Sequence, residues 1–125
     1  MYQRQVTFKE AVESALKSNY CNFDGRASRS QYWWFYLFQI IVSVVLYCLS
    51  PILGSSVTTL ATLINLALLL PALGLCFRRL HDTGKSGWWM LISLTGIGIL
   101  VLLVFFAQNS EMRANEYGPV PNMVN

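Results

Sequence analysis

Apolar residues fill two long stretches of this chain and leave no room in them for charge. Residues 30–77 contain no Asp, Glu, Lys or Arg, and neither do residues 86–110. As a single helix the first stretch would be about 72 Å long at 1.5 Å per residue, whereas the hydrocarbon core of a bilayer is about 30 Å thick. This stretch must therefore fold back once, and the proline, glycine and serines of residues 50–56 mark the place.

Three segments are long and apolar enough to cross a membrane. They cover residues 32–50, 57–77 and 88–107, and each is close to the roughly 20 residues that a span requires. Backbone polar groups in lipid need partners within their own segment, which favours helices where the sequence shows no strand-like alternation. The sequence therefore predicts an all-α membrane protein with three transmembrane helices, folded as one domain over residues 1–125.

An amphipathic helix is predicted before the spans, over residues 7–20. Thr7 and Glu10 have the spacing of a capping box. Apolar side chains then recur every four residues, at Phe8, Val12, Leu16 and Tyr20. Because charged residues fill the opposite side, we expect this helix to lie at the membrane interface or on the spans. The tail, residues 108–125, has no apolar period and is expected to be flexible.

Composition supports a membrane class. Hydrophobic residues make up 54% of the chain and charged residues 12%, which is about half the charge density of a soluble domain, and the mean hydropathy is +0.45. The first 29 residues hold eight charges and no apolar segment of the kind found in cleavable signals. The three cysteines and the single histidine have no metal-like spacing. We expect no metal, no cofactor and no nucleic-acid partner.

Lysine and arginine are unevenly distributed over the flanks of the predicted spans. Five precede the first span, none lies in the turn after it, three lie between the second and third, and one follows the third. Flanks rich in Lys and Arg stay on the cytoplasmic side of the membrane. The count therefore predicts a cytoplasmic N-terminus and a periplasmic C-terminus.

Two polar stretches, residues 23–34 and 78–89, lie on the same predicted side of the membrane. They supply a candidate interaction cluster of nine residues: Asp24, Gly25, Arg26, Arg29, Arg78, Arg79, His81, Asp82 and Trp88. Arginine offers phosphate a planar pair of donors, and a basic residue near an anionic leaflet contributes about 1 kcal/mol. A simpler interpretation is that the basic residues only orient the spans, while the two aspartates relieve their mutual repulsion.

The same stretches resemble the paired signatures of the YhaH/YhaI-like family of small bacterial inner-membrane proteins, grouped as a domain of unknown function. The matching patterns are Phe23-x-Gly25-Arg26-x-x-Arg29-x-x-Tyr32-Trp33 and Arg78-Arg79-Leu80-His81-Asp82-x-x-x-Ser86-Gly87-Trp88-Trp89. Residues 115–121 resemble the usual ending of these proteins. The resemblance implies several spans and an inner-membrane location, and it brings no activity, substrate or cofactor. The positions that it emphasises are Gly25, Arg26, Arg29, Arg79, His81, Asp82, Gly87 and Trp88.

Three functional hypotheses follow from these observations. The leading one is a non-enzymatic inner-membrane protein whose cytoplasmic-side cluster binds a partner or an anionic lipid headgroup. The first alternative is a homo-oligomeric transporter or channel subunit, in which Gln39 and Asn65 would face a path between copies. The second alternative is an enzyme acting on lipid, with His81 and Asp82 as acid or base. No residue is assigned a catalytic, cofactor-binding or metal-ligating role.

Overall fold

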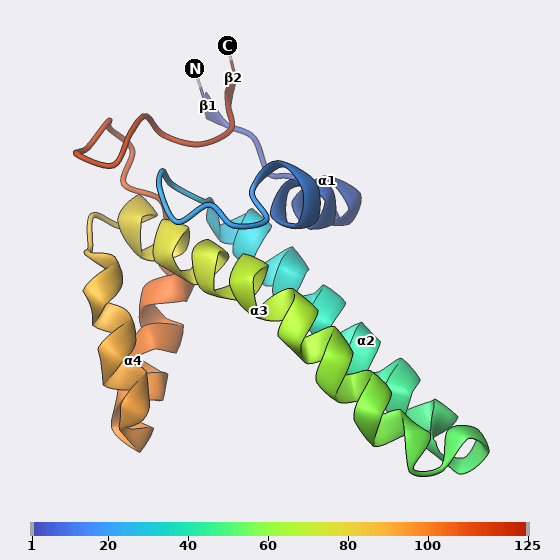
Figure 1. The fold of residues 1–125 in the computed structure, drawn as a ribbon. Coiled ribbons are helices and arrows are strands. Elements are labelled where there is room, and N and C mark those ends of the chain that lie inside the picture. Colours follow the sequence, from blue (N-terminus) through green and yellow to red (C-terminus); the bar gives the residue numbers. More distant parts are fainter. Residues whose placement is uncertain (1, 125) are drawn as a thin grey trace.

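Two helical arms extend from one polar cap (Figure 1). The computed structural model describes residues 2–124. Its helices are α1 (Phe8–Glu13), the π-helix η1 (Ser14–Ser18), α2 (Arg29–Leu53), α3 (Ser56–Asp82), the 3₁₀-helix η2 (Gly87–Leu94) and α4 (Gly96–Ala107). The strands β1 (Tyr2–Gln3) and β2 (Met123–Val124) have two residues each and pair antiparallel. The expected all-helical membrane class is confirmed.

The longer arm is a hairpin of α2 and α3. The helices have 25 and 27 residues, or about 38 and 40 Å at 1.5 Å per residue, and both are long and apolar enough to cross a bilayer. The turn between them begins at Gly54, whose φ of +60° is a backbone conformation that other residues rarely adopt. The predicted spans 32–50 and 57–77 lie within these helices, which extend beyond them into the cap.

The third predicted span, residues 88–107, is not a single helix. The structure divides it into η2 of eight residues and α4 of 12. These pieces are about 16 and 18 Å long, or about half the thickness of the hydrocarbon core. They lie side by side as a short hairpin that leaves the cap and returns to it (Figure 1). Neither piece alone is long enough to cross the hydrocarbon core.

Thr95 and Gly98 explain why the chain turns back there. The Thr95 hydroxyl accepts a hydrogen bond from the Gly98 N–H at 2.9 Å and so caps the start of α4. A side chain at Gly98 would collide with the backbone carbonyl of Ile92 on the other half of the hairpin. The sharp turn therefore depends on a polar cap and on close contact that only glycine permits.

The predicted N-terminal helix packs on the spans rather than standing apart from them. Its capping box is present, since the Thr7 hydroxyl accepts from the Glu10 N–H at 3.2 Å and the Glu10 carboxylate accepts from the Thr7 N–H at 3.2 Å. A side-chain hydrogen bond from Arg4 is the main reason that the pKa of Glu10 falls to about 2. The Phe8 ring contacts Trp34 edge-on, at 5.9 Å between centroids.

The C-terminal segment, expected to be a flexible tail, is hydrogen-bonded across the cap. The Glu111 N–H donates to the Asp82 carbonyl at 2.8 Å, and the Arg4 N–H donates to the Asn122 carbonyl at 2.8 Å. The register of β1 and β2 pairs Gln3 with Met123. The strands nearest the two ends of the chain therefore lie together in the cap, whereas the sequence predicts ends on opposite sides of the membrane.

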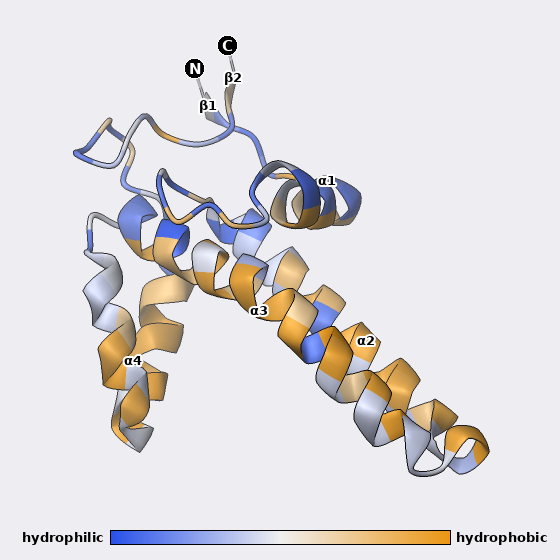
Figure 2. Cartoon of the chain, in the orientation of Figure 1, coloured by the Kyte–Doolittle hydropathy of each residue, from blue (hydrophilic) through white to orange (hydrophobic). Residues whose placement is uncertain are grey.

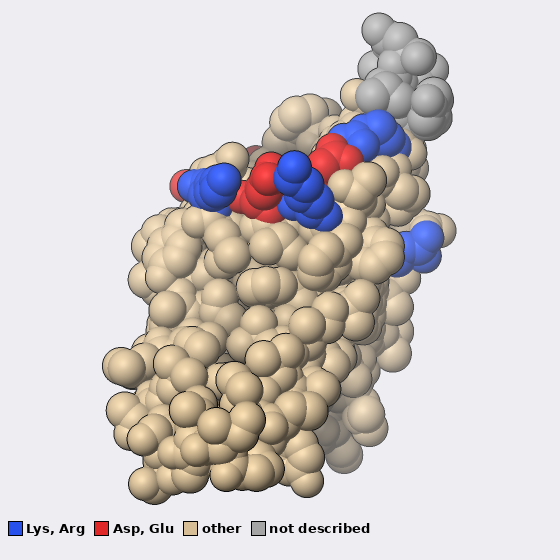
Figure 3. Space-filling view, turned by 90° about the vertical axis from the view of Figure 1, so that its right-hand side faces the viewer, with Lys and Arg blue, Asp and Glu red and all other residues tan. Residues whose placement is uncertain are grey.

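Charge and hydropathy follow the same division. Hydrophilic residues colour the cap and hydrophobic residues cover most of the two arms in Figure 2, apart from a hydrophilic patch midway along the longer arm. In the space-filling view of Figure 3, the visible Lys, Arg, Asp and Glu form a band at the cap end, above a broad uncharged surface. The arms are thus suited to hydrocarbon and the cap to the interface and water.

Because β1 and β2 pair in the cap, reporters on the N- and C-termini should be labelled from the same side of the membrane. A membrane-impermeant maleimide applied to oriented vesicles, with single cysteines near each end, measures this. A cysteine at Ser55, in the turn between α2 and α3, serves as the control and should be labelled from the opposite side. Termini on opposite sides would contradict this arrangement.

Candidate functional site

The side chain of Asp82 lies completely buried at the end of α3. One carboxylate oxygen accepts from Arg26 Nε at 3.1 Å, and the other accepts from Arg79 Nη1 at 2.6 Å. The Ser110 hydroxyl donates to that second oxygen. The side chains of Arg26 and Arg79 are 1% and 0% exposed. We call these four residues the Asp82 cluster; they join the loop before α2, the end of α3 and the C-terminal segment.

The remaining donors of the two arginines bind backbone carbonyls. Arg26 donates to the carbonyls of Arg113, at 2.8 Å, and Gly118, at 3.1 Å, and also to that of Glu111. These three acceptors belong to the C-terminal segment. Arg26 therefore fixes the path of this segment over the cap.

Arg79 connects the same carboxylate to the end of α4. Its Nε donates to the Phe106 carbonyl at 3.0 Å, and it also donates to the Gln108 carbonyl. The carbonyls at a helix C-terminus lack intrahelical partners and carry partial negative charge. A guanidinium at this position satisfies them and holds the returning end of the short hairpin against α3.

Local sequence places these side chains. Arg79 and Asp82 are three residues apart and therefore share a face of α3. The loop that carries Arg26 turns at Gly25, whose φ is +89°. The Gly25 carbonyl lies 2.9 Å from Nδ1 of His81, and the His81 ring stacks on Tyr117 at 4.0 Å between centroids. The loop, the helix and the C-terminal segment are thus in direct contact.

The other members of the predicted cluster lie outside the Asp82 cluster. Asp24 is exposed, and it lines a shallow surface hollow of about 260 Å³ together with His81 and Trp88, which is 76% exposed. Arg29 is exposed at the start of α2, where its Nη1 lies 3.4 Å from the Ala107 carbonyl. Only Arg26, Arg79 and Asp82 form one connected site, and that site is closed to solvent.

The buried guanidinium of Arg78, unlike that of Arg79, has no ionic partner among the described residues. The residue is 3% exposed, and no atom in residues 2–124 forms a hydrogen bond with its buried Nε and Nη2. Its backbone carbonyl accepts from the Ala27 N–H at 3.0 Å. The backbone of Arg78 thus holds the loop, whereas its charge has no partner in the described part of the protein.

Charged side chains at the edge of the cap have shifted pKa values. Burial lowers the pKa of Lys85, and the positive charge of Arg79 adds to this effect. Lys85 Nζ donates to the side-chain carbonyl of Gln108 at 3.0 Å and lies 4.5 Å from the centroid of the Phe105 ring. The hydrogen bond from Arg113 lowers the pKa of Glu111. Lys85 and Arg79 therefore both contact residues at the end of α4.

This geometry contradicts the hypothesis that His81 and Asp82 form an acid–base pair acting on lipid. The Asp82 carboxylate is bound by two arginines and a serine, and the His81 ring faces the Gly25 carbonyl and Tyr117. The two side chains have different partners, and the carboxylate is inaccessible. Within residues 2–124, no group of three or more His, Cys, Asp or Glu residues could hold a metal ion.

Comparison with known proteins gives the family. Residues 20–119 match the family described as "Protein of unknown function (DUF805)". The chain belongs to this family. The DUF805 match begins after α1 and η1 and includes all four residues of the Asp82 cluster.

Curated relatives of this DUF805 protein are inner membrane proteins. The chain is 46% identical to inner membrane protein YhaI of Escherichia coli (strain K12), over 86% of this chain and 92% of the relative. It is 40% identical to inner membrane protein YhaH of the same organism, over 84% of this chain and 91% of the relative. No solved structure matches it. The chain is thus an integral inner-membrane protein of an uncharacterised bacterial family.

Ser110 and the carbonyl acceptors of the C-terminal segment were not predicted as part of the site. A serine in a segment without apolar period gives no local signal, and backbone carbonyls give none at all. The family-like ending at residues 115–121 was the available clue, since Asn115 Nδ2 donates to the His81 carbonyl at 3.0 Å.

We predict that Asp82→Asn and Arg79→Met each destabilise the protein by about 3–5 kcal/mol, because each removes a charged partner from a buried ionic cluster. Arg78→Met should be nearly neutral or stabilising, since it removes a buried cation whose donors are unpaired. Thermal unfolding in mild detergent, followed by circular dichroism, compares the three variants. Equal losses for Arg78→Met and Arg79→Met would contradict the assignment.

Proposed function

We propose that this DUF805 protein is non-enzymatic and binds an anionic phospholipid headgroup at Arg29, where the cap meets the membrane. The observation that carries the proposal is the exposure of this one arginine. Arg26, Arg78 and Arg79 are buried, whereas Arg29 is exposed and forms no salt bridge with any residue in 2–124. An arginine in this state can offer its paired donors to a phosphate.

The surroundings of Arg29 fit a lipid. Ser28 caps α2, with its hydroxyl accepting from the Gln31 N–H, so Arg29 is the first residue of a membrane-spanning helix. One turn further into the membrane, a hollow of about 200 Å³ is lined by Ser30, Trp33, Trp34 and Leu37. Tryptophan side chains favour the headgroup level of a bilayer. A phosphate at Arg29 would place the glycerol and upper acyl chain beside this hollow.

Charge distribution supports a cytoplasmic cap, and we propose this orientation. Four Lys and Arg residues precede α2 and Arg29 begins it, three accompany the end of α3 and the following loop, and one lies in the C-terminal segment, while the turn between α2 and α3 has none. With both ends of the chain in the cap, the nine basic residues act together to retain it on the cytoplasmic side. The anionic inner leaflet then faces Arg29.

Transport by a homo-oligomer is a second candidate with one supporting observation. Gln39 and Asn65, on different helices, line the same crevice in the longer arm. A path between copies could use these amides. One chain has two full-length spans and a half-depth hairpin among its described residues, which is too little to enclose a path alone.

Arg29→Gln should weaken binding of phosphatidylglycerol about fivefold, the equivalent of the roughly 1 kcal/mol expected for one basic residue at an anionic leaflet. Arg29→Lys should retain most of the affinity. The measurement is lipid titration of the detergent-solubilised protein by native mass spectrometry, with phosphatidylcholine as the zwitterionic reference.

Lys9→Gln is the matched control, because it removes the same charge from a side chain that is 83% exposed elsewhere on the cap. It should leave the affinity for phosphatidylglycerol unchanged. If both variants lose binding equally, the lipid responds only to net charge, and the site at Arg29 is excluded. If neither does, Arg29 has no part in headgroup binding.

A further inference from the structure

The turn of the short hairpin lies at a depth where lipid offers no hydrogen-bond partners for its backbone. η2 and α4 are about 16 and 18 Å long, so their common turn lies near the middle of a hydrocarbon core about 30 Å thick. Leu94 and Ile97 at this turn are 85% and 77% exposed, and Thr95 and Gly96 between them are also exposed. We call residues 94–97 the hairpin tip.

Backbone N–H and C=O groups outside regular structure need hydrogen-bond partners at this depth. The N–H groups in the first turn of a helix have no intrahelical acceptors, and in α4 the Thr95 hydroxyl satisfies only that of Gly98. The N–H groups of Gly96 and Ile97 therefore need acceptors from elsewhere. Lipid-exposed irregular segments do not occur within hydrocarbon and are found there only where protein or a water-filled cavity covers them.

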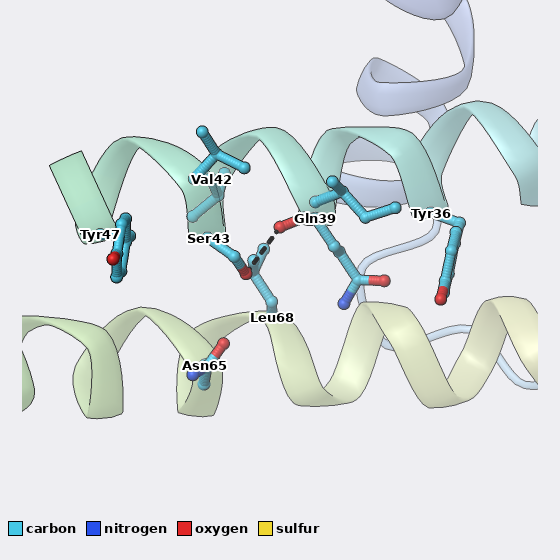
Figure 4. A pocket seen from close by; sticks show the side chains of 9 residues that line it. Tyr36, Gln39, Val42, Ser43, Tyr47, Asn65 and Leu68 are labelled. Carbon is cyan, nitrogen blue, oxygen red and sulfur yellow. Dashed lines mark hydrogen bonds between the residues drawn. The ribbon is translucent and has the colours of Figure 1, made fainter.

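The longer arm contains polar side chains that lack hydrogen-bond partners. A crevice of about 500 Å³ lies between α2 and α3, and polar side chains from both helices point into it among apolar ones (Figure 4). Within the described chain, neither the Gln39 side-chain amide nor the Asn65 side-chain amide forms a hydrogen bond; Ser43 donates only to the backbone carbonyl of Gln39, at 3.0 Å. The crevice thus offers unused acceptors.

Depth decides what can fill this crevice. Gln39 lies ten residues after Arg29, or about 15 Å along α2, which is close to the depth of the hairpin tip. Acyl chains have no donors, and headgroups remain at the surface. The tip of the same chain cannot reach the crevice, because the two arms diverge from the cap (Figure 1). The same molecule thus carries unpaired donors and unpaired acceptors at one level, on arms that cannot meet.

We propose that the hairpin tip of one copy lies in the α2–α3 crevice of a second copy. The Gly96 and Ile97 N–H groups then donate to the amide oxygens of Gln39 and Asn65, while Leu94 and Ile97 cover the apolar lining. Two copies related by a two-fold axis satisfy both contacts reciprocally. This assembly is independent of lipid binding at Arg29.

Cysteine crosslinking in native membranes tests the contact. Starting from a cysteine-free variant, in which Cys21, Cys48 and Cys76 are replaced by alanine, one tagged copy carries Leu94→Cys, which leaves the Thr95 cap intact, and a differently tagged copy carries Gln39→Cys. Oxidation should join the two tags in a single band. Asn65→Cys in place of Gln39→Cys should give the same product.

Matched controls use neighbours that face away from the crevice. Ile41→Cys and Leu66→Cys replace side chains that are 45% and 62% exposed and do not line it. We expect at least fivefold less crosslinking of Leu94→Cys to these positions. Equal yields would overturn the proposal, because they would indicate random collision in the membrane.

The oligomeric state gives a second readout. Native mass spectrometry of the wild-type chain in mild detergent should show a dimer, and Gln39→Leu combined with Asn65→Leu should reduce the dimer fraction at least tenfold. The helical content of this variant should be unchanged, since both side chains lie outside the buried core. A monomeric wild-type protein, or a dimer that keeps its stability in the double variant, would overturn the proposal.

Discussion

The carboxylate of Asp82, held between the guanidinium groups of Arg26 and Arg79, is the contact on which the rest of this fold depends. Burying three charges is costly unless each has its partners, and here the donors extend from the carboxylate to the backbone of the C-terminal segment and of α4. One ionic centre thereby joins segments that are far apart in sequence. It lies at the cap, where no charge has to enter hydrocarbon.

The topology follows from that centre. α4 ends in carbonyl groups that need donors, and Arg79 supplies them from the end of α3. The chain after α4 then meets Asp82 through Ser110 and continues across the cap to pair with the N-terminal strand. The segment between α3 and the C-terminal segment begins and ends at the cap. It therefore extends away from the cap and returns, and residues 88–107 form a hairpin about half as long as the hydrocarbon core is thick.

Closure of the ionic centre also limits what the molecule can bind. Arg26 and Arg79 are occupied by protein groups and Arg78 is buried, which leaves Arg29 as the accessible arginine of the candidate cluster, with Trp33 and Trp34 on the next turn of α2. Away from the cap, the polar groups without partners among the described residues include the side chains of Gln39 and Asn65 and the backbone of the hairpin tip. The two proposals therefore concern separate surfaces, one facing headgroups and one facing a second copy.

Sequence by itself determined the class of this protein and the position of its two full spans. The reason is that a segment of about 20 apolar residues without charge is stable in the hydrocarbon core whatever the rest of the chain does. Sequence also determined the capping box at Thr7 and Glu10. Tertiary structure alone decided that Arg26, Arg79 and Asp82 would be buried together, that Ser110 would join them, and that the third apolar stretch would turn at Thr95. Hydropathy measures whether a segment prefers lipid, but it contains no information on which distant carbonyl or carboxylate will bind its ends, and those long-range contacts set the direction of the chain.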